Sequence, residues 1–309
     1  MTRYFSEADV TAILTPSDAV EAVAGSFARA ARGGIDNRPR ERMPLHDGVF
    51  AVMACVDREL GYAGLKSYAW TETGTPFVVC LFSLCPAGLA AVIEADRLGQ
   101  LRTGAASAVA AQVLARPGAT TLGVIGAGWQ AASQVACMRA ALPAIDRVVV
   151  SSRDPERLAA FCAENGCEAA GSPMEAAAAD IVVTVTTSKA PVLRGDWLRP
   201  GTLVCAVGAN DASRRELDDR VLERADLICC DSVEQSQIES GDLIDPVARG
   251  VLDWAQVHEL ADVIGGAAKG RASSDDIVVF KSNGIAAWDV ALGARLIELA
   301  DAQGVGVRL

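Results

Sequence analysis

GVIGAGWQA, the stretch at residues 123–131, decides the fold of most of this chain. Its first three residues complete a short apolar run that begins at Thr121, and a segment with helical character comes after its glycines. In such a strand–turn–helix, Gly126 permits the tight turn, Gly128 lets a phosphate approach the backbone, and the small Ala131 allows close packing. A helix N-terminus also attracts negative charge. The pattern predicts a dinucleotide-binding turn, with a merely structural glycine turn as the alternative.

Short apolar runs alternate with helical segments from residue 120 onward. Further runs lie at residues 147–152, 181–185, 203–207, 227–230 and 277–280. Continuous apolar strands that alternate with helices indicate a parallel sheet covered on both faces. Arg116-Pro117-Gly118 ends the preceding helix, because proline removes a donor and disfavours helix in the residue before it. We therefore expect residues 118–284 to form a doubly wound Rossmann domain of the α/β class.

The first part of the chain has a different pattern, in which strand-like runs accompany helices. Runs at residues 49–56 and 64–70 predict a mainly antiparallel sheet with helices on one side. Apolar residues recur at helical spacing over residues 284–303, which predicts one long helix that packs back on this domain. We expect a smaller α+β domain made of residues 1–117 and closed by the C-terminal helix, residues 285–309.

Composition and charge exclude several classes of function. The chain has 309 residues, which suits two domains, and a net charge of −11, which repels nucleic acid. Its nine cysteines form no CxxC pair and there are two histidines, so we expect reduced thiols and no metal site. The uncharged stretch between Glu72 and Glu94 is interrupted by glycine and proline, which predicts two strands and no membrane span. The N-terminus lacks a signal-peptide pattern, so we expect a cytoplasmic protein.

The end of the second parallel strand, SSRD at residues 151–154, distinguishes between two nicotinamide cofactors. NAD sites usually place an acid here, whereas NADP sites place small polar residues and arginine for the 2′-phosphate. Ser152 and Arg153 therefore favour NADP, with NAD as the alternative. Asp154 is also explained as the cap of the next helix, because Pro155 follows at the first helical position.

In an acidic chain, an anionic substrate needs a local cluster of basic residues. Arg102 and Thr103 open an alanine-rich helix, where a helix N-terminus and an arginine would bind an anion. A surface arginine beside a Thr103 cap is the alternative. Lys66 ends an apolar run, although a lysine in a strand usually faces solvent. A third basic segment occupies residues 37–42.

These segments belong to a longer series of motifs. In chain order the series is RERMP at 40–44, Met53, Lys66, LRTGA at 101–105, GAGWQA at 126–131, VGAN at 207–210, RELD at 215–218, DS at 231–232 with EQ at 234–235, and FKSNG at 280–284. Together they resemble the ornithine cyclodeaminase and mu-crystallin family over nearly the whole chain. The resemblance implies a substrate domain closed by the C-terminal helix, a Rossmann domain, and a homodimer formed through the substrate domains.

The resemblance also implies roles for individual residues. Arg40, Lys66 and Arg102 would surround the carboxylate of the substrate. Arg42 is an alternative to Arg40, because it is two residues away on the same side of a strand. The residues implied to line the cofactor are Arg102, Thr103, Gly126, Ala127, Gly128, Trp129, Gln130, Ser152, Arg153, Ser282, Asn283 and Gly284.

The chemistry of these residues suits a carboxylate beside a reacting carbon, because paired cations fix its orientation. A lysine in a cationic pocket has a lowered pKa, which suits Lys66 for proton transfer to or from an imine nitrogen. One position departs from the family pattern. Cyclodeaminases carry an aspartate that holds the amino group of the substrate, whereas Asn210 stands here, followed by Asp211. An amide cannot accept a proton, which disfavours cyclodeamination unless Asp211 replaces the aspartate.

The sequence thus predicts an NAD(P)-dependent oxidoreductase that acts at the α-carbon of a small amino or imino acid. The first hypothesis is reduction of a cyclic or open ketimine carboxylate. The second is cyclodeamination of ornithine or lysine. The third, from another class, is a cofactor-bound ligand-binding protein of the mu-crystallin type without useful turnover.

Overall fold

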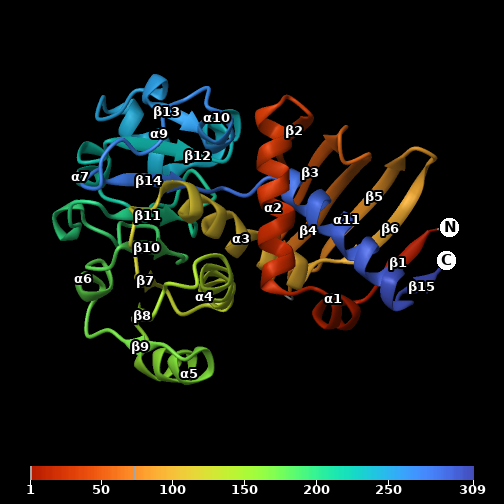
Figure 1. The fold of residues 1–309 in the computed structure, drawn as a ribbon, viewed down its shortest axis with the longest axis horizontal. Coiled ribbons are helices and arrows are strands. Elements are labelled where there is room, and N and C mark those ends of the chain that lie inside the picture. Colours follow the sequence, from red (N-terminus) through yellow and green to blue (C-terminus); the bar gives the residue numbers. More distant parts are fainter. Residues whose placement is uncertain (1, 73) are drawn as a thin grey trace. The chain divides into compact units, whose positions relative to one another are not determined.

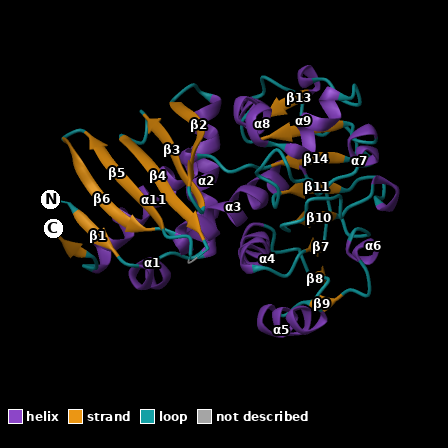
Figure 2. Ribbon diagram, turned by 180° about the vertical axis from the view of Figure 1, so that it is seen from behind, coloured by secondary structure: helices purple, strands orange, loops and turns teal. Residues whose placement is uncertain are grey.

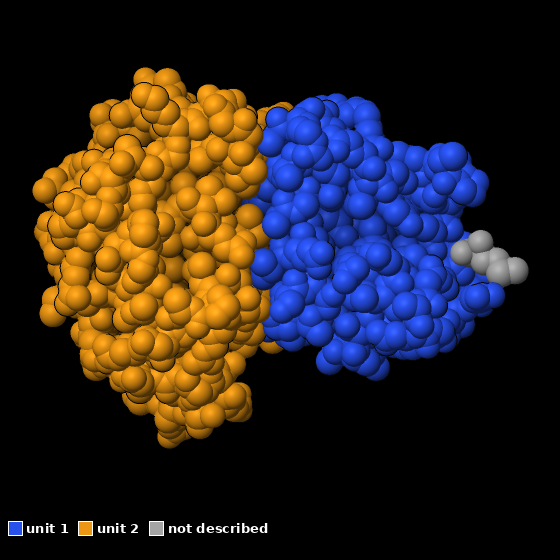
Figure 3. Space-filling model, in the orientation of Figure 1, with its two compact units in different colours: residues 1–102, 285–309 blue, residues 103–284 orange. Residues whose placement is uncertain are grey.

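The computed structural model describes residues 2–72 and 74–309, and the chain forms two compact units (Figures 1 and 3). Unit 1 comprises residues 1–102 and 285–309, and unit 2 comprises residues 103–284. The chain passes from one unit to the other inside helix α3 (Asp96–Leu114), earlier than the boundary expected at residue 117. Within unit 2, the side chain of Gln134, on α4 (Trp129–Ala141), donates to the carbonyl of Thr103 at 3.3 Å, which joins the later part of α3 to α4.

Unit 1 is built on a seven-stranded sheet in the order β15-β1-β6-β5-β4-β3-β2. Its strands are β1 (Arg3–Phe5), β2 (Ile35–Leu45), β3 (Gly48–Asp57), β4 (Tyr62–Thr71), β5 (Phe77–Leu84), β6 (Ala87–Glu94) and β15 (Val307–Arg308). Neighbouring strands are antiparallel, except that β1 runs parallel to β6. The predicted mainly antiparallel sheet is confirmed, and the two strands expected between Glu72 and Glu94 are β5 and β6, which ends at Glu94. Among the described residues, no helix has the length and apolarity that a membrane span requires.

Helices cover one face of this sheet, namely α1 (Glu7–Ile13), α2 (Pro16–Ala31) and α11 (Ala286–Gln303). Helix α11 packs against α2 and against the central strands β3, β4 and β5. The rings of Phe27 and Trp288 join α2 to α11, with their centroids 5.4 Å apart. Seen from behind in Figure 2, the strands lie in front, and no helix of the described part of unit 1 covers their other face.

Unit 2 contains an eight-stranded sheet in the order β13-β12-β14-β11-β10-β7-β8-β9, and all its neighbouring strands are parallel. The strands are β7 (Thr121–Ile125), β8 (Arg147–Ser151), β9 (Glu168–Ala169), β10 (Ile181–Thr184), β11 (Leu203–Ala206), β12 (Leu227–Cys230), β13 (Val257–Glu259) and β14 (Val278–Lys281). The helices besides α4 are α5 (Pro155–Asn165), α6 (Pro173–Ala176), α7 (Asp219–Glu223), α8 (Val233–Glu239), α9 (Gly241–Ala248) and α10 (Leu260–Gly265).

The order of strands in unit 2 reverses next to β7. Strands β8 and β9 extend the sheet on one side of β7, and β10 lies on the other side. In a doubly wound sheet, this switch point at the carboxyl ends of the strands is where ligands bind. The predicted α/β class with a parallel sheet is confirmed, and the turn at residues 126–128 lies at the switch point.

Close packing at the middle of β7 leads to a first prediction. A Cβ atom added at Gly123 would overlap the carbonyl oxygen of Ala176, which belongs to α6. The carbonyl belongs to the backbone and cannot turn aside as a side chain can. Gly123→Ala should therefore destabilise unit 2 by about 1–3 kcal/mol, the usual cost of overpacking. The measurement is the free energy of unfolding in denaturant. Gly88→Ala is the control, because a Cβ there meets nothing within 4 Å; equal effects of the two substitutions would contradict the prediction.

Candidate functional site

Three buried charged side chains meet in unit 1, on the side of the sheet that the helices cover. Lys66 comes from β4, Arg102 from α3 and Asp289 from α11. The Oδ1 atom of Asp289 lies 3.1 Å from Nζ of Lys66 and 3.3 Å from Nε of Arg102. One carboxylate oxygen therefore contacts two buried cations.

Aromatic rings and unsatisfied polar atoms complete the surroundings of this cluster. The ring centroid of Phe77 lies 5.0 Å from Nζ of Lys66, and that of Trp288 lies 5.7 Å from Cζ of Arg102, so both cations face π-systems. Within the described residues, Nη1 of Arg102 and Oδ2 of Asp289 are buried without a hydrogen-bond partner. Buried polar atoms of this kind are candidates for binding a polar ligand.

Arg40 is the buried arginine of strand β2. The pairing of β2 with β3 is interrupted by a β-bulge between Arg38 and Glu41, and Arg40 lies inside it. Its side chain is 6% exposed, whereas Arg42 is less buried. The charge of Arg40 also lowers the pKa of Lys66. The structure thus associates Arg40 with Lys66, and the bulge is the feature that distinguishes it from Arg42.

Burial is the main influence on the ionisation of Lys66. It lowers the pKa of the ammonium group from 10.5 to about 8. Contact with Asp289 opposes this change, while the positive charges of Arg102 and Arg40 add to it. Lys66 does not face solvent as a lysine in a strand usually does, and both of its protonation states are accessible near neutral pH.

The helix N-terminus predicted at Arg102 and Thr103 is wrong. Helix α3 begins at Asp96, so these two residues lie inside it and offer no free helix N-terminus. The first N–H groups of α3 are capped by Glu7, whose carboxylate accepts from the backbone of Asp96 and Arg97. This cap comes from a distant part of the sequence, which is why the start of the helix was misplaced.

The glycine turn of unit 2 has the geometry that a dinucleotide requires. Gly126 has φ +122°, and a Cβ there would overlap the carbonyl oxygen of Val185. Gly128 is the N-cap of α4 and offers no side-chain cap. A Cβ at Gly128 would meet only Nη2 of Arg157, at 3.7 Å, so the space beside this backbone is open. Trp129 and Gln130 form the first turn of α4, and the turn fits a pyrophosphate at its N–H groups.

Polar and basic residues follow the carboxyl end of the neighbouring strand β8. Ser152 is half-buried and Arg153 is exposed. Asp154 accepts from the backbone N–H of Arg157 at 3.0 Å, so its role as the cap of α5 is confirmed. Sequence reasoning missed Arg157, whose Nε donates to the carbonyl of Ala127 at 2.9 Å. Its position in the first turn of the helix that follows Arg153 is the available signal.

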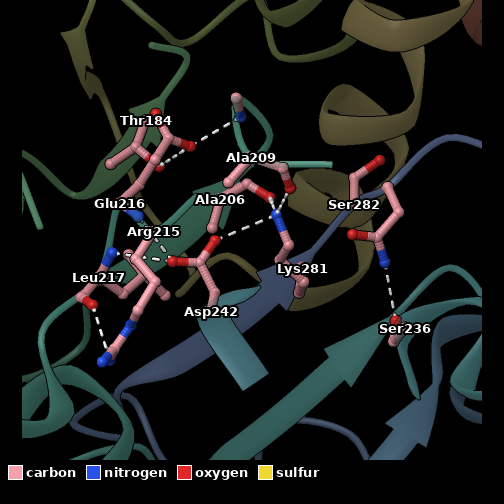
Figure 4. A network of polar contacts seen from close by, with 12 residues as sticks. Thr184, Ala206, Ala209, Arg215, Glu216, Leu217, Ser236, Asp242, Lys281 and Ser282 are labelled. Carbon is pink, nitrogen blue, oxygen red and sulfur yellow. Dashed lines mark hydrogen bonds and ion pairs between the residues drawn. The ribbon is translucent and has the colours of Figure 1, made fainter. Parts of the chain in front are cut away.

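A buried lysine holds the loop that follows β11 (Figure 4). Nζ of Lys281 lies 3.1 Å from the carboxylate of Asp242, and neither side chain is exposed. The same ammonium group donates to the carbonyls of Ala206 and Ala209. These bonds fix the backbone on which residues 207–211 are carried.

The loop after β11 carries Asn210 and Asp211, the two residues that the sequence analysis relates to the choice between reduction and cyclodeamination. Asn210 and Asp211 are both partly buried. Oδ1 of Asp211 accepts from the backbone N–H of Ser213 at 2.9 Å, so this carboxylate already serves a local turn. Glu216 also holds this loop, because its carboxylate accepts a hydrogen bond from the N–H of Gly208 at 2.7 Å.

The segment at residues 282–284, after β14, is held by another buried acid. Oδ2 of Asp231 accepts from the N–H groups of Asn283 and Gly284, each at 2.7 Å, and from the hydroxyl of Ser282. The side chain of Asn283 donates to Ser236 at 2.8 Å, so it points into unit 2. The residues of unit 2 that the sequence predicts to line the cofactor therefore lie at the carboxyl ends of β7, β8 and β14.

Comparison with known proteins shows the family to which this chain belongs. The model of the ornithine cyclodeaminase/mu-crystallin family matches residues 2–302. The chain belongs to this family. It is 32% identical to the iminosuccinate reductase of Paracoccus denitrificans, over 97% of each chain. It is 38% identical to the Delta(1)-pyrroline-2-carboxylate reductase of the same organism, over 67% of each chain.

A solved structure of a family member has the same fold along its whole length. The Delta(1)-pyrroline-2-carboxylate reductase of Thermococcus litoralis, solved with NADH and L-proline, matches with a TM-score of 0.91 and 28% identity. The match covers 99% of this chain and 100% of that one. The family resemblance predicted from the sequence motifs is confirmed.

The buried position of Lys66 leads to a second prediction. Its folded-state pKa of about 8 lies below the ordinary value of 10.5, so between these pH values the unfolded chain binds a proton that the folded chain lacks. The free energy of unfolding should therefore rise with pH across this window, and Lys66→Met should lose that rise. Denaturant unfolding at a series of pH values measures it. The exposed Lys269, changed to Met, should leave the wild-type profile intact, whereas a wild-type profile in Lys66→Met would contradict the burial.

Proposed function

We propose that this chain is an NAD(P)H-dependent reductase that reduces a small imino acid, a ketimine carboxylate, at its α-carbon. The observation that carries the proposal is Lys66, a buried proton-bearing group beside Arg102 and Arg40. The reductases among its relatives act on imino acids, as their names state, which supports the same class of substrate. The nicotinamide cofactor, when bound at the turn of residues 126–128, supplies the hydride.

Arg40 and Arg102 bind the carboxylate of the substrate in this proposal. A guanidinium group offers paired donors that match the two oxygens of a carboxylate. Nη1 of Arg102 is a buried donor that has no hydrogen-bond partner within the described residues. A carboxylate held there fixes the adjacent imine carbon, which is the orientation that a hydride transfer requires.

Lys66 acts as the proton donor. When the imine carbon accepts the hydride, the electron pair of the C=N bond moves to the nitrogen, which takes a proton from the Lys66 ammonium. The product is the amine, and Lys66 is left neutral until water returns a proton to it. A pKa of about 8 suits this role, because an acid is most effective when its pKa lies near the working pH.

Asn210 favours reduction over cyclodeamination. Its amide can hold the nitrogen of a substrate but cannot take a proton from it. An imine brings no such proton to remove, whereas the α-amine of ornithine does. The carboxylate of Asp211 could serve instead, but Oδ1 is bonded to Ser213.

The third prediction is the assay of both reactions. With NADPH, the wild type should reduce a cyclic imino acid and release little ammonia from ornithine. Lys66→Met should lower turnover by at least ~10²-fold, the scale for losing a positioned acid, while cofactor binding stays unchanged. Absorbance at the wavelength of the reduced nicotinamide follows the reaction. Strong ammonia release that disappears in Asp211→Ala would assign cyclodeamination in its place, and tight cofactor binding without any turnover would support a ligand-binding protein.

We propose further that NADPH is preferred to NADH. Ser152 and Arg153 follow β8, and the nearby acid, Asp154, caps α5. Arg157 adds a second guanidinium beside the glycine turn. A 2′-phosphate would meet two arginines here, although the relative from Thermococcus litoralis was solved with NADH.

A fourth prediction tests the preference. Arg153→Ala should weaken NADPH binding by about 1.5–3 kcal/mol, the range for hydrogen bonds to charged groups, and leave NADH nearly unchanged. Titration calorimetry with both nucleotides measures the dissociation constants. Arg199→Ala, an exposed arginine elsewhere in unit 2, is the matched control. Equal losses for the two nucleotides in Arg153→Ala would defeat the assignment.

The open face of the sheet in unit 1 supports a homodimer. Six neighbouring residues on β4 and β5 point away from the helices and carry no charge: Ala63, Leu65, Ser67, Val78, Cys80 and Phe82. Phe82 is 42% exposed, whereas its neighbour Leu81 on the opposite face is fully buried. A contiguous apolar face of this kind is typical of a protein interface. We propose that two copies pair through it, in the cytoplasm, where the nine free thiols would stay reduced.

The fifth prediction concerns this face. Leu65→Lys places a charge at its centre and should convert a dimer into a monomer, because an unpaired charge is costly in an apolar interface. Light scattering after size-exclusion chromatography measures the mass. Met174→Lys, at an exposed residue of α6 in unit 2, is the control and should remain dimeric. A Leu65→Lys dimer, or a monomeric wild type, would rule this face out.

A further inference from the structure

Asp289 is the acid of the charged cluster in unit 1, and it stands in an apolar helix. Its neighbours Trp288 and Val290 are buried, and Asp289 itself is 1% exposed. An isolated carboxylate in such a place is strongly disfavoured, because burial removes it from water. It is compensated by Lys66 and Arg102, which both contact Oδ1.

The charges that face Lys66 come from several elements. Arg40 on β2 and Arg102 on α3 repel its ammonium, while Asp289 on α11 attracts it. Asp96, at the start of α3, is a more distant acid that also interacts with Lys66. Strand β5 contributes the uncharged ring of Phe77. Without Asp289, Lys66 would be buried beside two arginines with no anion in contact, which favours the neutral amine.

Asp289 and a substrate carboxylate would contact different atoms of Arg102. Asp289 contacts Arg102 at Nε and leaves Nη1, which belongs to another edge of the guanidinium. Helix α3 allows Lys66 to reach Asp289 because Gly99 has no side chain: a Cβ there would come within 2.7 Å of Nζ of Lys66. The ammonium is thus held by Asp289 while part of Arg102 remains for another anion.

We propose that Asp289 is a positioning residue that keeps Lys66 protonated and fixes its ammonium beside Arg102, so that Lys66 can donate a proton to the imine nitrogen. This inference rests on the reductase function proposed above. It gives the C-terminal helix a part in the reaction. The family motifs that the sequence analysis quotes do not include this helix.

The test follows the titration of Lys66 without any substrate. The free energy of unfolding is measured against pH for the wild type and Lys66→Met, and again for Asp289→Asn and Asp289→Asn/Lys66→Met. The difference within each pair isolates the contribution of Lys66. Its rise with pH should begin about one pH unit or more lower in the Asp289→Asn pair, because the neutral amide no longer favours the ammonium. Asp289→Glu keeps the charge and should restore the wild-type onset.

A second variant covers the case in which Asp289→Asn does not fold. Arg102→Met removes a repelling charge and leaves Asp289 paired with Lys66, so the rise should begin at a higher pH than in the wild type. A general loss of structure would not move the two onsets in opposite directions. An onset that stays in place in both Asp289→Asn and Arg102→Met would overturn the proposal.

Kinetics then separate this proposal from the reductase itself. In the pH profile of kcat/KM for imine reduction, the alkaline limb should move to lower pH in Asp289→Asn by the same amount as the stability onset. A wild type that reduces imino acids but shows no such movement in Asp289→Asn would overturn the role of Asp289 alone. A protein that reduces no imino acid would overturn the proposed reductase function and the proton donation by Lys66. If the pH at which its stability begins to rise still moves in Asp289→Asn, the contact of Asp289 with Lys66 as its counter-ion stands.

Discussion

The contact of Asp289 with Lys66 and Arg102 organises the interior of unit 1. Buried cations need an anion within contact distance, because the cost of removing them from water is otherwise too large. The anion comes from α11, so this helix has to lie across β3, β4 and β5 with Asp289 turned toward the sheet. Packing and electrostatics therefore specify the same position for the helix. The rings of Phe77 and Trp288 complete the surroundings of the two cations.

Unit 2 uses buried charges for a different purpose. Burial raises the pKa values of Glu216 and Asp231, yet both acids accept hydrogen bonds from backbone N–H groups of the loops beyond the strands. Lys281 donates to carbonyls of the same region and pairs with Asp242. Loops at the carboxyl edge of a parallel sheet cannot use the sheet ladder, so these side chains satisfy their backbone groups. These contacts hold the backbone of the loops beyond β11 and β14 in place.

The sequence predicted best those features that depend on neighbouring residues. The turn at 126–128, the cap at Asp154 and the strand–helix alternation are local, and the structure contains all three. The start of α3 was misplaced because its cap, Glu7, is distant in the chain. Asp289 was missed for the same reason, since its partners lie far away, although a single acid in the apolar stretch 285–292 was a usable signal.

The order in which the chain is synthesised gives the return of α11 to unit 1 a further consequence. Residues 103–284 are continuous, so unit 2 can complete its sheet as soon as they leave the ribosome. Unit 1 has to wait for the last segment, which supplies α11 and the edge strand β15. Until then, the strands that α11 covers, β3, β4 and β5, lack that helix, and Lys66 lacks its acid. A prematurely terminated product would keep this apolar surface exposed, which is the kind of feature that chaperones and proteases recognise.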